Sequence, residues 1–174
     1  MELRIRRART ADVRDIRGLV DHYAPSRALL EKPTVTLYED VQEFWVAEAG
    51  GDSAESGTGA AVVGCGALHV MWEDLAEVRT VAADTAYRGH GIGHRLLEQL
   101  LDTARQLGVR RVFVLTFEVE FFARHGFRPI EGTPVSRDVY GELLRSYDEG
   151  VAEFLDLEWV KPNTLGNTRM LRYL

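Results

Sequence analysis

The sequence feature that most constrains the fold is a glycine-rich turn at residues 88–93 (RGHGIG), which separates two regular patterns. Residues 75–83 before it alternate between two faces, which predicts a strand. The residues after it carry one apolar stripe at helical spacing, formed by Ile92, Leu96, Leu97, Leu100, Leu101 and Ala104. A strand that enters a helix through such a turn indicates a domain that combines helices with a sheet.

The glycine turn also predicts a ligand. The start of a helix leaves backbone N–H groups without acceptors in the helix and carries the positive end of the helix dipole. Glycine lets the backbone approach a bulky anion, so the pattern predicts a pyrophosphate site. Glycines also form tight turns that bind nothing. A Rossmann fingerprint looks similar, but this turn follows four predicted strands rather than one, and its Arg-x-x-Gly-x-Gly spacing is different.

The rest of the chain predicts a single domain over residues 1–174, of the α/β (α+β) class. The other predicted strands are a short one around Leu3 and Ile5, then 44–49, 61–71, 112–115, 127–130 and 168–174. The other predicted helices are 11–23, capped by Thr10 and ended by Pro25, then 37–44, 118–125 and 136–146. We expect Gly108 to end the helix after the glycine turn. Gly64 and Gly66 are expected to allow either a bulge or a close backbone approach, and residues 50–59 to form a turn.

Composition excludes several classes of protein. Hydrophobic residues make up 45% of the chain, charged residues 28%, and the net charge of -6 argues against nucleic-acid binding. Cys65 is the only cysteine, so neither an internal disulfide nor a zinc cluster of thiolates can form. Residues 1–10 lack the apolar segment of a signal peptide, and no apolar run is long enough for a membrane span. We therefore predict a cytoplasmic enzyme or binding domain. The histidines show no metal-ligand pattern, so we predict no metal.

Two segments resemble a known superfamily. Residues 77–93 (EVRTVAADTAYRGHGIG) are similar to the acetyl-CoA signature of the GNAT acetyltransferases, and residues 121–127 (FFARHGF) resemble the helix and Gly-Phe strand entry that follow in that superfamily. The resemblance implies a GNAT fold, with a mixed, mostly antiparallel central sheet flanked by helices, and acetyl-CoA as co-substrate.

A closer resemblance is to the acetyltransferase domain of N-acetylglutamate synthase. It rests on residues 29–32 (LLEK), 77–83, 112–116 (VFVLT) and 121–127. The kinase-like domain of many such synthases is absent from this sequence, so the resemblance points to the short stand-alone form. That form acetylates glutamate or glutamine at the start of arginine biosynthesis.

The resemblance also assigns the catalytic and cofactor residues. Glu77 occupies the position of the proposed general base, and the alternatives are an ion pair with Arg79 on the same strand face or a solvated edge residue. A backbone N–H between Val81 and Ala83 is expected to polarise the thioester carbonyl. The implied cofactor-binding residues are Val81, Ala82, Ala83, Arg88, Gly89, His90, Gly91, Ile92, Gly93, His94 and Phe122.

The leaving thiolate has no obvious proton donor. Many members of the superfamily hold a tyrosine where this sequence has Phe122, which cannot donate a proton. A thiolate with a pKa near ~8.5 leaves without much help. Thr116 can supply a hydroxyl to it or hold a water, and the alternative role for this hydroxyl is to cap the next helix.

An acidic amino-acid substrate requires cations. Lys32 stands where the synthase resemblance implies an arginine that binds a carboxylate, and the alternative is a solvated surface lysine. Arg79 can contact the α-carboxylate. Lys161, Thr168 and Arg169, near the last strand, are weaker candidates.

Two other functions remain open. One is acetylation of protein N-termini or lysines, which requires an open groove that residues 134–167 would more readily close. The other is a non-catalytic acetyl-CoA sensor, which would keep the glycine turn but would not need Glu77. By analogy with fold relatives, the chain is expected to pair as a homodimer through edge strands.

Overall fold

The computed structural model describes residues 2–24, 32–50 and 60–174. The chain divides into two compact units. The first comprises Met1–Leu68 and Val78–Thr103, and the second comprises His69–Glu77 and Ala104–Leu174. The prediction of one domain stays a prediction.

The strands form a seven-stranded mixed sheet with the order β1-β2-β3-β4-β5-β7-β6. Adjacent strands are antiparallel in the pairs β1/β2, β2/β3, β5/β7 and β6/β7, whereas β4 and β5 are parallel. The strands are β1 (Glu2–Arg7), β2 (Phe44–Gly50), β3 (Ala61–Trp72), β4 (Leu75–Ala83), β5 (Arg111–Thr116), β6 (Arg128–Pro129) and β7 (Thr168–Tyr173). This sheet confirms the predicted fold class.

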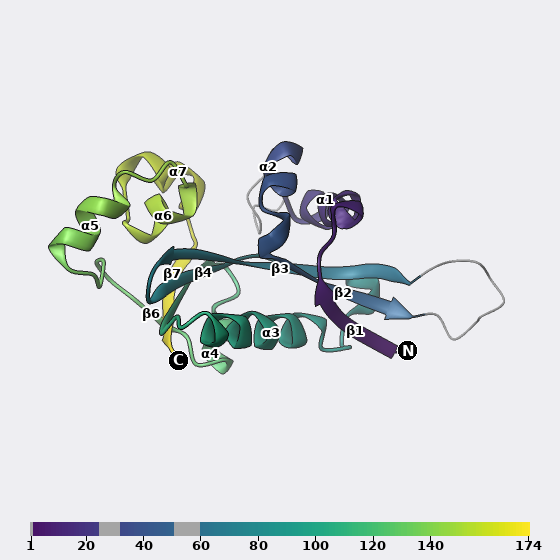
Figure 1. Cartoon of the computed structure of the whole chain (residues 1–174). Helices are drawn as coiled ribbons and strands as arrows, with labels where there is room; N and C mark the ends of the chain where they lie inside the picture. Colours follow the sequence, from purple (N-terminus) through teal and green to yellow (C-terminus); the bar gives the residue numbers. More distant parts are fainter. Residues whose placement is uncertain (1, 25–31, 51–59) are drawn as a thin grey trace. The chain divides into compact units, whose positions relative to one another are not determined.

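The first unit packs helices on both faces of its strands. The helices are α1 (Val13–Tyr23), α2 (Thr34–Glu39) and the main part of α3 (Ile92–Gln106). Figure 1 shows α1 and α2 on one face and α3 on the opposite face. One apolar cluster therefore joins α1 and α2 to β2 and β3, and a second one joins α3 to β2 and β3. Every residue of the predicted stripe on α3 is buried, which confirms that stripe.

Two glycines of β3 set how closely α3 approaches the sheet. A Cβ atom at Gly64 would lie 2.5 Å from Cγ2 of Ile92, and one at Gly66 would lie 3.1 Å from Cδ1 of Leu100. The predicted close approach is confirmed, because larger side chains at these positions would push the helix away. Gly108 ends α3 with a φ of +83°, as expected for a C-terminal glycine.

The second unit builds a separate core on β5 and β7. Its helices are α4 (Val119–Arg124), α5 (Arg137–Leu143), α6 (Glu149–Phe154) and α7 (Lys161–Thr164), and α5, α6 and α7 lie together in Figure 1. The core residues of this unit include Leu75, Phe113, Leu143, Val151, Phe154, Leu155 and Leu171. An ion pair between side chains also supports it, since Arg111 donates to both carboxylate oxygens of Asp74 at 3.0 and 3.2 Å.

Several predicted boundaries were wrong. Thr10 does not cap α1, because residues 10–12 form a short 3-10 turn in which the carboxylate of Asp12 accepts the N–H of Arg9 at 2.7 Å. The helix predicted at 37–44 begins earlier, at Thr34, and ends at Glu39, since a second short turn leads into β2. The strand predicted at 127–130 is reduced to Arg128–Pro129.

Some predictions fall outside the described residues. Pro25 and most of the turn predicted at 50–59 lie there, as do the first three residues of the LLEK motif. Among the described helices, none combines the length and the apolar character that a bilayer crossing requires.

Candidate active site

The connection from β4 to α3 is held by hydrogen bonds within the first unit. The N–H of Asp84 donates to the carbonyl of Val63 on β3 at 2.8 Å. The carboxylate of Asp84 accepts the N–H of Ala86 at 2.9 Å and so caps the short 3-10 turn that precedes the glycines. The end of the strand therefore fixes the start of the glycine turn.

The glycine turn uses backbone conformations that favour glycine. Gly89 has a φ of +86° and Gly91 a φ of +70°. A Cβ atom at either position would meet no described atom within 4 Å, so the requirement is conformational and not a matter of crowding. The open space beside both glycines fits a bulky anion.

The amides of this turn differ in their availability. The N–H of Arg88 donates to Thr85 at 3.2 Å and the N–H of His90 to Tyr87 at 3.3 Å. The hydrogen-bond ladder of α3 begins with the N–H of Arg95, which donates to Gly91 at 3.0 Å. Ile92 and Gly93 lie in the first turn, where the helix itself offers no acceptor. An anion site here would therefore draw on the first turn of α3 more than on the whole of residues 88–94.

An irregularity interrupts β4 before the glycine turn. Thr80 has a φ of +57°, which is rare for a β-branched residue. Its side chain is buried, and its carbonyl accepts a hydrogen bond from Sγ of Cys65 at 3.5 Å. Burial raises the pKa of the Cys65 thiol to about 12, so the thiol is poorly suited to act as a nucleophile. The irregularity breaks the two-residue alternation that was predicted along this strand.

Glu77 lies where the pairing of β4 with β5 ends. It is 4% exposed and lies opposite Phe113, in the last of three parallel residue pairs. Thr116 is three residues further along β5, or about 10 Å. Because side chains alternate along a strand, Glu77 shares its sheet face with Phe113 and Leu115, whereas Thr116 points to the other face.

Thr116 and Thr168 are brought together by the sheet. They lie directly opposite each other in the antiparallel pairing of β5 with β7. Oγ1 of Thr116 accepts the N–H of Glu118 at 2.9 Å, so the hydroxyl caps the entry to α4, as one of the two alternatives held. The hydrogen of this hydroxyl is not used in that bond, since the oxygen is the acceptor.

A hollow of about 230 Å³ lies on the sheet face that Glu77 shares. It is lined by residues of β5, β7, α6 and the segment between α6 and β7, which include Leu115, Glu153, Lys161, Thr164, Asn167 and Arg169. Nζ of Lys161 lies 2.8 Å from Oε1 of Glu158, and this hydrogen bond raises the lysine pKa. Lys161 therefore reaches the hollow as a charged group with a carboxylate beside it.

Arg169 has a supporting role in this hollow. Its guanidinium donates to the carbonyls of Glu153 at 3.1 Å and Gly132 at 2.9 Å, and also to that of Phe154. Burial lowers its pKa. These bonds tie β7 to the end of α6, so the guanidinium is already engaged by backbone carbonyls.

The remaining predicted residues are spread over both units. In the first unit, Lys32 is half-buried and its carbonyl accepts a hydrogen bond from Arg17, while Arg79 is half-buried on β4. In the second unit, Phe122 is 5% exposed and packs edge-on against Phe127, with ring centroids 5.3 Å apart. The ring of Phe122 is thus a core element of its unit.

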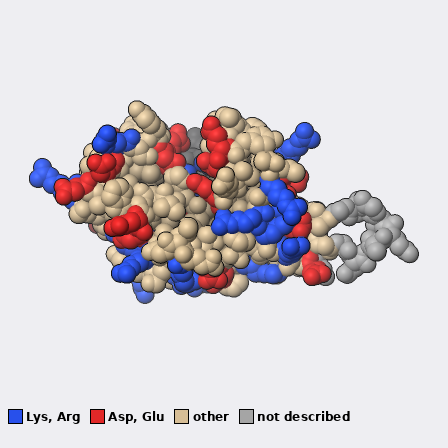
Figure 2. Space-filling model, viewed as in Figure 1, with Lys and Arg blue, Asp and Glu red and all other residues tan. Residues whose placement is uncertain are grey.

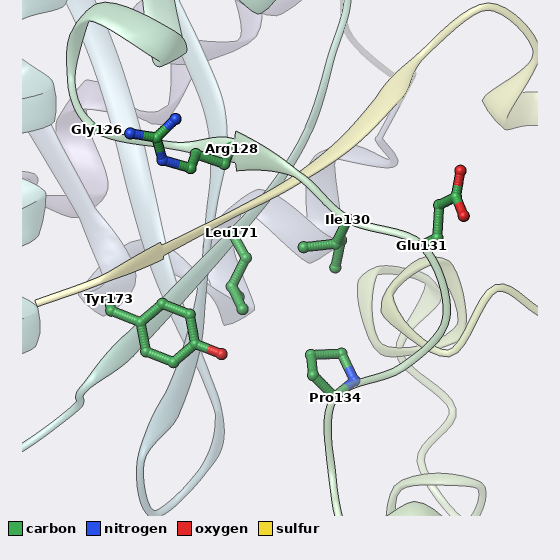
Figure 3. A pocket seen from close by; sticks show the side chains of 7 residues that line it. All are labelled: Gly126, Arg128, Ile130, Glu131, Pro134, Leu171 and Tyr173. Carbon is green, nitrogen blue, oxygen red and sulfur yellow. The ribbon is translucent and has the colours of Figure 1, made fainter.

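A larger hollow, of about 330 Å³, lies beside β6 and β7 and includes none of the predicted site residues. Leu171, Ile130 and Pro134 form its apolar wall, whereas Figure 3 shows the charged ends of Arg128 and Glu131 pointing away from it. On the face drawn in Figure 2, basic and acidic side chains are interspersed. Neither feature resembles a phosphate or nucleic-acid site.

The sequence interpretation missed one residue near the proposed cofactor segment, residues 81–93. Oη of Tyr23, at the end of α1, donates a hydrogen bond to the carbonyl of Ala83 at 2.5 Å. The two residues are 60 positions apart. A tyrosine at the end of a helix carries no sequence signal that would reveal such a partner.

Comparisons with known proteins agree with this geometry. The model of the acetyltransferase (GNAT) family matches residues 13–127. An amino-acid acetyltransferase of Mycobacterium tuberculosis is 63% identical over 170 residues, which cover 98% of this chain and 94% of that protein. An amino-acid acetyltransferase of Aeromonas salmonicida is 31% identical over 137 residues, which cover 75% of this chain and 29% of that protein.

Solved structures show the same fold. A Mycobacterium tuberculosis protein in complex with CoA and a second ligand aligns with a TM-score of 0.88 and 62% identity, over 98% of this chain and 99% of that one. The N-acetylglutamate synthase of Neisseria gonorrhoeae, complexed with coenzyme A and N-acetyl-glutamate, aligns with a TM-score of 0.74 and 23% identity, over 100% of this chain and 35% of that one. The chain therefore belongs to the acetyltransferase (GNAT) family, and it is an acetyltransferase.

Proposed function

We propose that this chain transfers the acetyl group of acetyl-CoA to the α-amine of L-glutamate or L-glutamine, the first step of arginine biosynthesis. The observation that carries the proposal is the glycine turn, with its positive φ angles at Gly89 and Gly91, placed at the end of a strand that also bears the buried carboxylate of Glu77. The 63% identity to an amino-acid acetyltransferase supports the same substrate class.

Glu77 is the proposed general base. An α-amino group titrates near ~8 in model peptides, so it must lose a proton before it can attack the thioester. A carboxylate removes that proton directly or through one water. The nearly complete burial of Glu77 limits competition from bulk water.

The cofactor segment supplies the remaining groups for the transfer step. A backbone N–H between Val81 and Ala83 polarises the thioester carbonyl, and fixed donors of this kind contribute a few kcal/mol to the transition state. Residues 88–94 bind the diphosphate, mainly through the amides in the first turn of α3. The hydroxyl of Thr116 is a weaker proposed contact for the leaving thiolate, directly or through a water, because it points to the sheet face opposite that of Glu77 and already accepts the N–H of Glu118. Acetyl-CoA thus enters as a co-substrate, and the amine attacks it in a ternary complex.

The amino-acid substrate requires polar groups at both of its ends. The hollow lined by Lys161 and Asn167 offers an ammonium and an amide, which suit the side-chain carboxylate of glutamate or the amide of glutamine. Lys32, Arg79 and Thr168 are the other proposed contacts. The homodimer, the cytoplasmic location and the absence of a metal stay predictions.

A substrate panel tests the proposal. Thiol release from acetyl-CoA is measured with each protein amino acid, with a short peptide and with free lysine. We expect glutamate or glutamine to give the highest kcat/KM. Aspartate and asparagine, one methylene shorter, should fall lower by about tenfold or more.

Two outcomes would contradict the proposal. Faster turnover with the peptide or with lysine would favour a protein acetyltransferase. Tight coenzyme A binding without turnover on any amine would favour a sensor.

A further inference from the structure

Tyr23 occupies a position that joins helix α1 to the cofactor segment. It is the last residue of α1, and its half-buried ring packs against the apolar cluster that α1 shares with β2 and β3. Its Oη atom lies 2.5 Å from the carbonyl oxygen of Ala83, the last residue of β4. A hydrogen bond this short between a phenol and a carbonyl fixes both groups.

The carbonyl that Tyr23 binds points away from β3. It belongs to the peptide bond between Ala83 and Asp84, and the described chain contains no cis peptide. The C=O and the N–H of a trans peptide point in opposite directions. Because the N–H of Asp84 donates to Val63 on β3 at 2.8 Å, the carbonyl of Ala83 must face the opposite edge of β4.

This edge of β4 is the one on which a strand-like ligand can bind. Backbone groups that point away from a neighbouring strand are those an added chain would pair with. The tyrosine hydroxyl takes the place of such a partner at Ala83. The backbone groups of a strand point to the same edge at every second residue. Val81, two residues earlier, is therefore the nearest residue whose N–H and C=O point to this edge.

The same peptide also leads into the glycine turn. Asp84 follows directly, and its carboxylate caps the 3-10 turn that precedes Gly89. A rotation of this peptide would move both the end of β4 and the start of the turn. The two halves of the proposed cofactor site, along the strand and at the head of α3, therefore meet at the carbonyl that Tyr23 holds.

We propose that Tyr23 is a positioning residue for acetyl-CoA, whose hydroxyl fixes the peptide between Ala83 and Asp84 and so aligns the strand that lies along the pantetheine arm with the turn that binds the diphosphate. This proposal rests on the proposed function, because it takes acetyl-CoA as the ligand. Tyr23 does not contact the reacting atoms in this account. Its loss affects cofactor affinity and leaves the chemical step largely intact.

The Tyr23→Phe variant tests the proposal, because it removes one oxygen atom and keeps the ring that packs in the core. We expect the Kd for coenzyme A, measured by calorimetry, and the KM for acetyl-CoA each to rise about fivefold to tenfold. The kcat at saturating acetyl-CoA should change less than about twofold, and so should the KM for the amino acid. Tyr38→Phe is the matched control, since Tyr38 lies on α2 and is 45% exposed.

The outcomes separate this proposal from the proposed function. If wild-type protein binds no coenzyme A, the proposed function fails. If wild-type binds it and Tyr23→Phe binds it equally well, the positioning role fails, whatever happens to stability. A fall in kcat with an unchanged KM for acetyl-CoA would also overturn it, because the hydroxyl would then act on the chemistry.

Discussion

The two sides of the proposed reaction, acetyl-CoA binding and the chemistry at the acceptor amine, depend on different kinds of chemical group. The proposed cofactor segment, residues 81–93, would act through its main chain, which has positive φ angles, amides at a helix start and one peptide held by Tyr23. The residues proposed in the second unit would act through side chains, with Glu77 buried and Lys161 at the wall of a hollow. The difference implies that substitutions should affect acetyl-CoA binding through backbone geometry, and the chemical step through single functional groups.

The largest expected effect is that of Glu77→Gln. The amide keeps the size of the side chain but cannot accept the proton, so kcat should fall by about 10²- to 10³-fold. The Kd for coenzyme A should stay within about twofold of wild type. Steady-state kinetics and calorimetry measure the two quantities separately.

Glu73→Gln is the matched control for that substitution. Glu73 is exposed in the turn between β3 and β4, four residues before Glu77, and its loss should leave kcat unchanged. An unchanged kcat in Glu77→Gln would reject Glu77 as the base. A large rise in the Kd for coenzyme A in Glu77→Gln would contradict the proposed separation between cofactor binding and the chemical step.

A smaller effect is expected for Gly91→Ala. The φ of Gly91 is +70°, and an alanine there costs roughly 1–2 kcal/mol, although no described atom would clash with its Cβ. If the turn relaxes to avoid this cost, the Kd for coenzyme A should rise about tenfold while kcat at saturation stays nearly constant. Calorimetry of the variant gives the Kd.

Gly141→Ala provides the comparison within a helix. Gly141 lies in α5, where a Cβ would also meet no described atom within 4 Å and φ is not positive. Its Kd for coenzyme A should equal that of wild type. Equal affinities for both glycine variants would show that the conformation of the turn does not matter for binding.

A cluster of charged residues in the first unit should contribute to the stability of the fold. It should affect neither acetyl-CoA binding nor the chemical step. Arg6 donates to Asp12 at 2.7 and 2.9 Å and to Glu48 at 2.9 and 3.1 Å. Hydrogen bonds from Arg6 hold the pKa of both carboxyls below their ordinary values of 3.8 and 4.5. Because the folded pKa values are depressed, this stabilisation is present above about pH 4.5 and is lost as the pH falls further.

Arg6→Met should lower the free energy of unfolding at pH 7 by about 2 kcal/mol, since it leaves the buried carboxylate of Asp12 and the half-buried one of Glu48 without their shared partner. The difference from wild type should shrink as the pH is lowered from 7 to 3, because the stabilisation from depressed carboxyl pKa values diminishes below their ordinary values of 3.8 and 4.5. Urea denaturation at the two pH values measures it, with Arg14→Met on the exposed face of α1 as the control. An equal loss at both pH values would contradict this account.

The features of the proposed cofactor segment, which depend on the main chain, were easier to predict from sequence than the side-chain arrangement on the acceptor side. The stripe on α3, the glycine turn and Gly108 follow local rules of helix period and φ preference, so the sequence predicted them correctly. Thr80 did not follow such a rule. A β-branched residue normally favours regular strand, and only the surrounding sheet imposes its φ of +57°.

Hydrogen-bond partners that are far apart in the chain also could not be predicted from the sequence. The bond from Tyr23 to Ala83 and the three carbonyls around Arg169 depend on how distant segments pack. The register of β5 on β4 likewise decides that Glu77 and Thr116 point to opposite faces, and no local pattern fixes a register. Residues proposed for one reaction step can therefore be named from sequence before their relative geometry is known.

The most direct test of the account is a crystal structure of this protein with coenzyme A. We expect the diphosphate to accept hydrogen bonds from amides in the first turn of α3, at Ile92 and Gly93, with Gly89 and Gly91 keeping their positive φ angles. A diphosphate bound elsewhere, or a turn whose amides point away from it, would contradict the central claim.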